Sequence, residues 1–435
     1  MEPDPASPYR FRVPKPNYLP HNIDADEPIF ENAHYFNKVK RMAHEYGITK
    51  PKGYNVTFHY NPNMERHHFG QTHPMKPWRL TLTKSLVTSY GMNFAMDNYT
   101  ARTATYEELT NFHTKDYVDF LATVAPQPTP LDVDNMHPDL KFNLGGSDCP
   151  LFEGLYDYCS MSAGSSLDAA RKIYVHHGDG VEEAFLSTDR VMTVSFHKYD
   201  PNTFFPGTGA LDDNGPKSEH NPGAHHALNV PLNDGITDEQ YAWLFENVIS
   251  RCVEKFRPSA IALQCGADSL AGDRLGKFNL LVEGHSSCVE YCKKLGIPLI
   301  MFGGGGYTPR NVARAWAYET AVAIGQHKNI PTQIPEHTPW RERFRHETLL
   351  PTIEQILGEP RQNRNPQKKL QDIVQHVTEQ LRFVSHAPSV QYQVIPPDLG
   401  PIRDEVEQRL KEEAELHDDN ARKLREEAMG VPMEM

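Results

Sequence analysis

The sequence of 435 residues lacks the features of membrane, secreted and disulfide-rich proteins. No run approaches the roughly 18 apolar residues that a membrane-spanning helix needs. The N-terminal segment MEPDPASPYRFRVPKP has no apolar stretch like that of a signal peptide. The six cysteines form no Cys-x-x-Cys pair. These absences predict a soluble intracellular protein with reduced thiols.

The sequence also has few apolar residues and no dense block of basic residues. Its formal net charge is −13, so direct binding to nucleic acid is not expected, whereas a basic partner such as a Lys-rich peptide is. The hydrophobic share is only 38%, and prolines (35) outnumber glycines (28). This composition indicates a globular centre with polar ends.

The chain divides into three predicted regions. Residues 1–50 form a largely disordered or irregular lead, residues 51–345 alternate strand and helix patterns, and residues 346–435 form a polar, partly helical tail. The continuous apolar strands of the central region are typical of a parallel sheet covered on both faces. The sequence therefore predicts an α/β fold with a single open, mostly parallel sheet flanked by helices. Strands are expected at 54–60, 191–199, 259–268 and 297–307, and helices at 105–124, 237–256, from Pro309 onward, 365–384 and 402–428.

Reactive side chains stand at or just after the ends of three predicted strands. These are His197, Asp268 and Tyr307. Ligand sites in open α/β sheets form at the carboxyl ends of strands, so we expect these residues to meet. Gly303–Gly306 is not a P-loop, because no Lys-Ser/Thr pair follows it. These glycines are expected to let the backbone pass close to the site and to aim Tyr307 inward.

The motif HHGDG at residues 176–180 is a second indication of a site. Asp and neutral His are zinc ligands, and zinc beside a Tyr hydroxyl indicates hydrolysis, in which the metal activates water and the Tyr stabilises an oxyanion. A structural explanation also exists, because Asp179 fits a helix N-cap with Glu182 three residues later. Only residues 173–175 precede the motif as a strand, which is unusually short.

Six segments carry specific motifs, in order between about residues 54 and 345, namely FHYNPNMERHHFGQTHPMKPWRLTLT, GGSDCPLFEGLYDYCSMSAGSSLDAARKI, HHGDGVEEAFLSTDRVMTVSFHKYDPNTFFPGTG, LNVPLNDGITDEQY, LQCGADSLAGDRLGKFNL and MFGGGGYTPRNVARAWAYET. Together these segments resemble the class I zinc-dependent histone deacetylases. The resemblance implies an arginase/deacetylase-like fold and hydrolysis of N-acetyl-lysine on histone tails. It also implies transcriptional repression within a corepressor complex of the nucleus, with the cytoplasm as a second location. The cofactors implied are Zn²⁺, a structural K⁺ and inositol phosphate.

The resemblance also assigns roles to single residues. His176 and Asp268 match zinc ligands, and Tyr307 matches the Tyr that stabilises the oxyanion. Substrate-binding roles fall on Asp148 at the rim, Phe205 in the acetyl-lysine channel and Arg79 behind the acetate-release cavity. The positions that bind inositol phosphate in some members are Lys76, Arg274 and Arg310.

Part of the family pattern is missing from this chain. Tyr174 stands where the family has a zinc-ligand Asp, and AARKI runs directly into YVHHGDG. The family has a β-α-β unit here with a His-His dyad, and a parallel crossover needs about a dozen residues or more. We interpret His225 and His226 as unrelated to that dyad, because they lie just before LNVPLNDG, separated from it by Ala227. The sequence therefore predicts the loss of a central β-α-β unit.

This loss predicts weak or absent catalysis. Two protein ligands are fewer than the three usual for catalytic zinc. A missing general base removes a contribution of about 10²–10⁴-fold. A spliced-out exon, a gene-model error or a catalytically dead isoform would each leave such a sequence. The alternative functions are a dead corepressor-binding interaction protein and a deacetylase of small acetylated amines.

Overall fold

The computed structural model describes residues 33–71, 73–124, 126, 142, 144–146, 149–170, 179–216, 218 and 220–384. These residues all belong to one compact unit, which spans residues 1–387. Three predicted features lie outside the described residues, namely Asp148, the segment 171–178 with Tyr174 and His176, and the helix at 402–428. Within the described ranges, no helix is long and apolar enough to cross a membrane.

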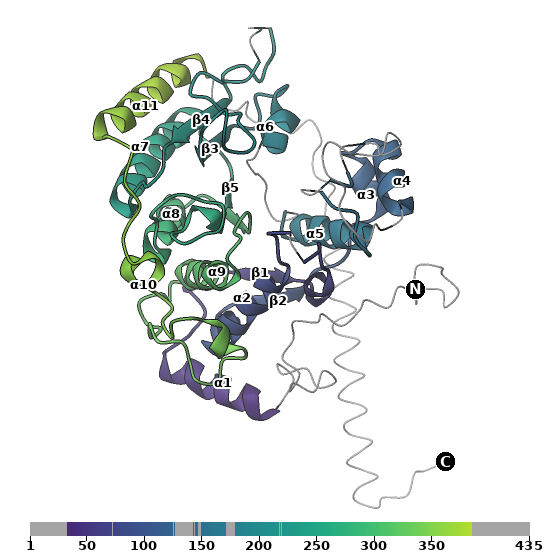
Figure 1. The fold of residues 1–435 in the computed structure, drawn as a ribbon, viewed down its shortest axis with the longest axis vertical. Coiled ribbons are helices and arrows are strands. Elements are labelled where there is room, and N and C mark those ends of the chain that lie inside the picture. Colours follow the sequence, from purple (N-terminus) through teal and green to yellow (C-terminus); the bar gives the residue numbers. More distant parts are fainter. Residues whose placement is uncertain are drawn as a thin grey trace, which may run out of the picture. The chain divides into compact units, whose positions relative to one another are not determined.

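The N-terminal half contains two short strands and several helices (Figure 1). Residues 33–45, inside the region where the sequence shows little pattern, form a helix that buries Tyr35, Val39 and Ala43. The predicted helix at 105–124 is two helices, because Thr114 has extended backbone and starts a second one. The elements are α1 (Ala33–Glu45), β1 (Thr57–Tyr60), η2 (Pro62–Arg66), α2 (Trp78–Ser89), η3 (Met92–Ala95), β2 (Asp97–Thr100), α3 (Tyr106–Thr110), α4 (Lys115–Thr123), α5 (Leu155–Ala170) and α6 (Asp179–Phe185).

The C-terminal half follows the predicted alternation of strands and helices. The helix predicted to begin near Pro309 does so, with the proline in its first turn. The helix predicted at 237–256 is also confirmed, although Thr237 makes no side-chain capping bond. The elements are β3 (Thr193–Lys198), β4 (Ala227–Leu232), α7 (Asp238–Phe256), β5 (Ile261–Gln264), η5 (Ala267–Ser269), α8 (Val282–Lys294), β6 (Leu299–Phe302), α9 (Pro309–Ala323), η6 (Arg341–Arg343), α10 (Ile353–Leu357), α11 (Gln367–Gln380) and η7 (Leu381–Phe383).

The described strands form three separate sheets of two strands each. β1 pairs with β2, β3 with β4, and β5 with β6. Every pair is parallel, as predicted. A single continuous sheet, which the sequence also predicted, is not found in the described part of the chain, because β3 and β5 each pair on one edge only.

Helices cover the strands and form the core with them. Helices α7, α8, α9 and α2 pack against one another in that order (Figure 1). All six residues of β4 are buried, and Leu228, Val230 and Leu232 belong to the hydrophobic cluster that includes side chains of α7 and α11. In contrast, the residues of β5 are only partly buried and Gln264 is exposed. The residues of β6 are also only partly buried, apart from Ile300, so the strands at 259–268 and 297–307 are less covered than predicted; within the described ranges β5 pairs on one edge only.

Candidate active site

The glycine-rich loop after β6 lies directly against Asp268, which follows β5. A Cβ atom at Gly305 would lie 2.2 Å from Oδ2 of Asp268, and one at Gly266 would lie 2.9 Å from Oδ1. Gly306 has a φ of 127°, which favours glycine. The loop can therefore approach the carboxylate only because it carries no side chains, as the sequence predicted.

Arg79 connects this loop to α2. Its guanidinium donates a hydrogen bond of 2.7 Å to the carbonyl oxygen of Gly306 and lies over the ring of Trp316, 5.0 Å from its centroid. Burial of the side chain lowers the pKa of Arg79. Nearby groups, among them the Tyr307 hydroxyl and the Asp268 carboxylate, act in the opposite direction and raise this pKa. The structure thus brings three of the predicted site residues, Arg79, Asp268 and Tyr307, into one electrostatic cluster.

Asp273 fixes the backbone on which Tyr307 stands. Its carboxylate accepts a hydrogen bond of 2.8 Å from the backbone N–H of Tyr307. It also accepts bonds of 2.9 and 3.0 Å from the N–H groups of Leu275 and Gly276. Asp273 is 4% exposed, so these bonds take the place of water around a buried carboxylate. The sequence analysis missed this residue, although its position in the turn AGDRLG is typical of an Asp that binds nearby backbone N–H groups.

A buried pair of polar side chains supports the loop from below. Nδ1 of His285 on α8 contacts Oε1 of Glu319 on α9 at 2.5 Å, and its Nε2 contacts the carbonyl oxygen of Gly266 at 3.2 Å. Trp316 donates a bond of 2.7 Å to the carbonyl of Cys265. The end of β5 is therefore held by α8 and α9 just before Asp268. The sequence did not predict this contact, because His285 and Glu319 stand on different helices and neither belongs to a recognisable motif.

The protonation of Asp268 responds to this environment. Burial raises the pKa of the Asp268 carboxyl, and the neighbouring charge of Asp273 raises it further. A bond to backbone N–H and the charges of His285 and Arg79 act in the opposite direction. A carboxyl with a raised pKa in a site is typical of functional groups, and a positive ion bound beside it would restore its charge.

Two other predicted residues, His197 and Phe205, stand on β3 and in the loop that follows it. Both ring nitrogens of His197 are engaged, with the Ser195 hydroxyl at 2.8 Å and the Gly209 carbonyl at 2.9 Å. Burial lowers the pKa of His197. Phe205 lies in the loop after β3 and is 78% exposed.

His225 and His226 stand at the amino end of β4, whereas the clustered residues follow carboxyl ends of strands. The ring of His225 stacks on Phe383 with 4.8 Å between centroids. His226 contacts the Ala224 carbonyl at 2.8 Å. These contacts support the interpretation that the pair is structural.

A basic cluster lies beside the site. Lys76 donates to the carbonyls of Gly70 and Gln71, at 2.9 Å each. Burial and the charge of Arg274 lower the pKa of Lys76. The segments before Arg274 and Arg310 are joined by a bond of 3.1 Å from the Thr308 hydroxyl to the Gly272 carbonyl. The three residues predicted to bind inositol phosphate, Lys76, Arg274 and Arg310, therefore lie on segments that pack together.

The described residues do not complete a metal site by themselves. Among them there is no group of three or more His, Cys, Asp or Glu side chains that could hold a metal ion. Asp268 is the one predicted zinc ligand within the described ranges, and catalytic zinc usually has three protein ligands.

Comparisons with known proteins agree with the motifs. The family model described as Histone deacetylase domain matches residues 73–175 and 173–323. The chain is 40% identical to human Histone deacetylase 1 in an alignment that covers 79% of this chain and 78% of the relative. It is 40% identical to the Drosophila melanogaster protein named Histone deacetylase HDAC1, covering 82% and 74%. It is 39% identical to Arabidopsis thaliana Histone deacetylase 6, covering 85% and 87%.

Proposed function

The chain belongs to the histone deacetylase family. We propose that it descends from an enzyme that hydrolyses N-acetyl-lysine on histone tails, and that this chain has lost most of that activity. Its setting would be a nuclear corepressor complex that represses transcription. The observation that carries the proposed chemistry is the cluster of Asp268, Tyr307 and Arg79 around the glycine loop.

The clustered residues have complementary roles in such a site. The Tyr307 hydroxyl would donate a hydrogen bond to the oxyanion that forms when water attacks an amide carbonyl. Arg79 would hold the Gly306 carbonyl and offset the charge of the two nearby carboxylates. Asp268 would be a ligand of zinc, which supplies water activation and carbonyl polarisation when bound. Asp148 and Phe205 would bind the substrate at the rim.

Two features of the comparisons support the proposed loss of a β-α-β unit. The family model matches in two pieces that meet at residues 173–175, where the short strand precedes HHGDG. The alignment with the human relative runs over 399 positions, but 79% of this chain is only about 344 residues, so about 55 positions fall opposite gaps. If they formed one gap, these positions would be enough for a strand, a crossover helix and a second strand.

The direct test is release of acetate from an acetylated histone peptide. We expect this chain to be slower than its human relative by at least the 10²–10⁴-fold, roughly, that a missing general base costs. The variant Asp268→Asn is the matched control and should lower any residual rate further. Turnover similar to that of the relative, abolished by a zinc chelator and by Asp268→Asn, would contradict the proposed loss.

Sequencing the transcript across Lys172–His176 would separate the possible origins of the gap. A transcript that contains the missing unit would identify a gene-model error, and the encoded full-length protein should then be active. A transcript that matches this chain would indicate an isoform without the unit.

A second candidate function is a non-catalytic subunit of a corepressor complex. The observation that favours it is the basic cluster of Lys76, Arg274 and Arg310, which does not depend on the missing unit. We expect inositol hexakisphosphate to bind the purified chain in a salt-dependent manner, with Lys76→Ala weakening binding. Co-purification with corepressor subunits as a soluble chain would support this function, and aggregation on expression would exclude it.

A further inference from the structure

A basic segment lies on the surface between α10 and α11 (Figure 1). Its residues 358–366 have no regular secondary structure, and α11 begins at Gln367. The net charge of −13 is a sum over the whole chain and does not describe the charge of this surface. We call residues 358–369 the basic strap. It contains one acidic residue, Glu359, and four basic residues, Arg361, Arg364, Lys368 and Lys369.

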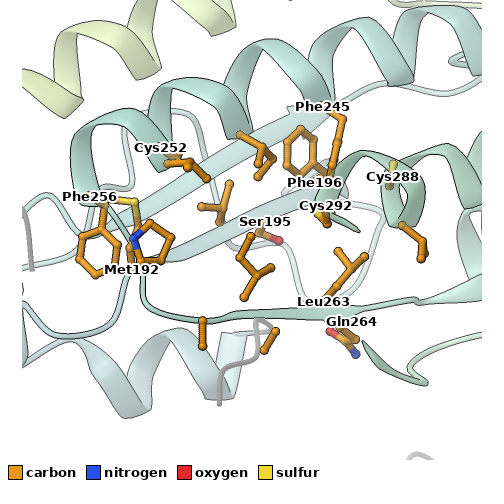
Figure 2. Close-up of a pocket in the computed structure, with 18 of the residues that line it drawn as sticks. Met192, Ser195, Phe196, Phe245, Cys252, Phe256, Leu263, Gln264, Cys288 and Cys292 are labelled. Atoms are coloured by element: carbon orange, nitrogen blue, oxygen red, sulfur yellow. The ribbon is translucent and has the colours of Figure 1, made fainter. Parts of the chain in front are cut away.

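The basic strap belongs to the outer surface of the protein. A large cavity between β3, β5, α7 and α8 receives side chains such as Phe196 and Phe245 (Figure 2). None of the described residues that line this cavity belongs to the strap. Of residues 358–369, only Asn365 is buried. The basic side chains of the strap therefore reach the solvent.

The backbone of the strap is fixed against the turn that follows β4. The side chain of Asn365, which is 2% exposed, donates hydrogen bonds of 3.0 Å to the carbonyls of Asn233 and Asp234. Its oxygen accepts a bond of 2.8 Å from the N–H of Asn233. Gly235 permits this close approach, because a Cβ atom there would lie 2.2 Å from the carbonyl oxygen of Gln362. The strap thus presents its charges from a fixed position.

A neighbouring segment adds Lys277 to this surface. The side chain of Asn279 donates a hydrogen bond of 2.8 Å to the carbonyl of Arg361 and accepts one of 3.0 Å from its N–H. Lys277 directly follows Gly276, where a Cβ atom would lie 1.6 Å from the carbonyl oxygen of Asp268. The basic surface therefore continues toward the candidate active site.

The charges of this surface are not neutralised by acidic side chains. The Nε atom of Arg361 is buried and has no hydrogen-bond partner. The nearby carboxylate of Asp234 is already paired with Lys198. Within the described ranges, no ion pair and no side-chain hydrogen bond is found for four basic residues, Lys277, Arg361, Arg364 and Lys368.

Two of the lysines stand where a helix disfavours positive charge. Lys368 and Lys369 lie in the first turn of α11, which holds no acidic residue. The partial positive charge at a helix N-terminus repels cations and attracts anions, so both lysines oppose the helix unless an anion is bound. Lys369 has a partner, because its Nζ donates a bond of 2.9 Å to Oδ1 of Asn233. Lys368 has none in the part of the chain that the structure describes.

The strap therefore offers fixed, unpaired positive charges to an extended anion. Duplex DNA is such an anion, because it carries about one negative charge per 1.7 Å of its axis. Arginine guanidinium groups bind phosphate oxygens in pairs, and lysines bind them as point charges. The choice of DNA rests on the proposed function, since a histone tail leaves a particle that is wrapped in DNA. A chain that binds such a tail has DNA beside it.

We propose that the basic strap and Lys277 bind the phosphate backbone of duplex DNA beside the histone tail. The four unpaired residues, Lys277, Arg361, Arg364 and Lys368, contact phosphates and read no bases. Three or four such contacts give weak, salt-sensitive binding that does not depend on sequence. This binding holds the chain on its substrate particle and requires neither zinc nor catalysis.

The test uses the full chain and a fluorescein-labelled DNA duplex of about 20 base pairs, followed by fluorescence anisotropy. We expect a dissociation constant of about 10⁻⁶–10⁻⁵ M at 50 mM salt. The affinity should fall about 40- to 150-fold between 50 and 200 mM salt, because three or four contacts release that many counterions.

A pair of matched variants tests the place of binding. Lys368→Glu should weaken binding about five- to tenfold and reduce the salt slope by about one. Lys115→Glu is the matched control, because Lys115 is also an exposed lysine in the first turn of a helix, α4. This helix packs against α3 and α5, and the control should change the affinity less than twofold. An acidic residue suits a first turn, so both variants should fold as the wild type does.

Three results would overturn the proposal. The first is no saturable binding at 50 mM salt with protein up to about 10⁻⁴ M. The second is an equal loss of affinity in Lys76→Ala and Lys368→Glu, which would place the DNA on the cluster of Lys76, Arg274 and Arg310. The third is equal affinity for a polyglutamate peptide of the same length, which would indicate an acidic protein as the partner. None of these measurements uses acetate release, so a failure of DNA binding is distinguishable from a failure of the proposed function.

Discussion

Gly276 offers the most direct test of the geometry around Asp268. A Cβ atom at Gly276 would lie 1.6 Å from the carbonyl oxygen of Asp268 and 2.8 Å from its carbonyl carbon. The φ of Gly276 is not in the left-handed region, so alanine would meet no backbone strain there. The effect of Gly276→Ala is therefore purely steric.

The magnitude follows from what the new methyl group meets. The methyl group meets backbone atoms, which cannot rotate away as the end of a long side chain can. Real Cβ atoms essentially never approach another atom closer than 3.0 Å, so the backbone at Gly276 and at Asp268 must separate by more than 1 Å. Overpacking of this kind costs about 1–3 kcal/mol. We expect a loss near the upper end, about 2–3 kcal/mol. Any residual catalysis should fall by up to about 100-fold, because Asp268 moves with its backbone.

The assay is urea denaturation followed by far-UV circular dichroism, with Gly180→Ala as the matched control. Gly180 lies in α6, and a Cβ atom there meets nothing within 4 Å. Alanine is favoured over glycine within a helix by roughly 0.5–1 kcal/mol, so the control should be as stable as the wild type or more stable. If Gly276→Ala unfolds at the same urea concentration as Gly180→Ala, the close packing against Asp268 is refuted.

Three further changes test other parts of the structure. Burial raises the pKa of the Asp238 carboxyl to about 6, so this carboxyl binds a proton more tightly in the folded protein than in the unfolded chain. The free energy of unfolding should therefore fall as the pH rises from about 4 to 6. Asp238→Asn should remove that fall and gain about 1–2 kcal/mol at pH 7, with no gain at pH 4; thermal unfolding at both values checks this. Asp273→Ala should lower the free energy of unfolding by about 2–4 kcal/mol, because the hydrogen bonds from the backbone N–H groups of Tyr307 and two other residues are lost. An unchanged midpoint of urea denaturation would contradict this expectation. Lys50→Ala breaks an exposed pair with Asp97 and should change stability by less than about 1 kcal/mol; a larger loss by calorimetry would show a role beyond the pair.

The sequence predicted several elements of the fold, because their signals are local, but it did not predict α2 and α8, which carry Arg79 and His285. The apolar stripe of α7, the first-turn proline of α9 and the capping box of Thr105 and Glu108 all depend on residues a few positions apart. Each is found as expected. The glycine loop was also predicted, since a run of glycines after an apolar strand has few other uses.

The sequence did not predict features that depend on distant pairs. The contact between His285 and Glu319 joins two helices, and neither residue stands in a recognisable motif. The division into three sheets depends on which strand edges meet, and the apolar pattern of β5 is the same whether one edge or both are paired. The ligand roles of His176 and Asp268 and the substrate role of Asp148 stay predictions.

Trp316 gives the protein an internal optical reporter at the site. Its indole N–H is bonded to the carbonyl before the Asp268 turn, and the guanidinium of Arg79 lies over its ring. Indole emission shifts to longer wavelength when the ring leaves a dry, fixed environment for water. Of the chain's four tryptophans, Trp316 is the one whose ring lies under the Arg79 guanidinium in the described residues. The difference in emission between the chain and the variant Trp316→Phe would therefore report whether the site is folded, without any substrate. The folding of the candidate site can therefore be measured in solution even if the chain has little catalytic activity.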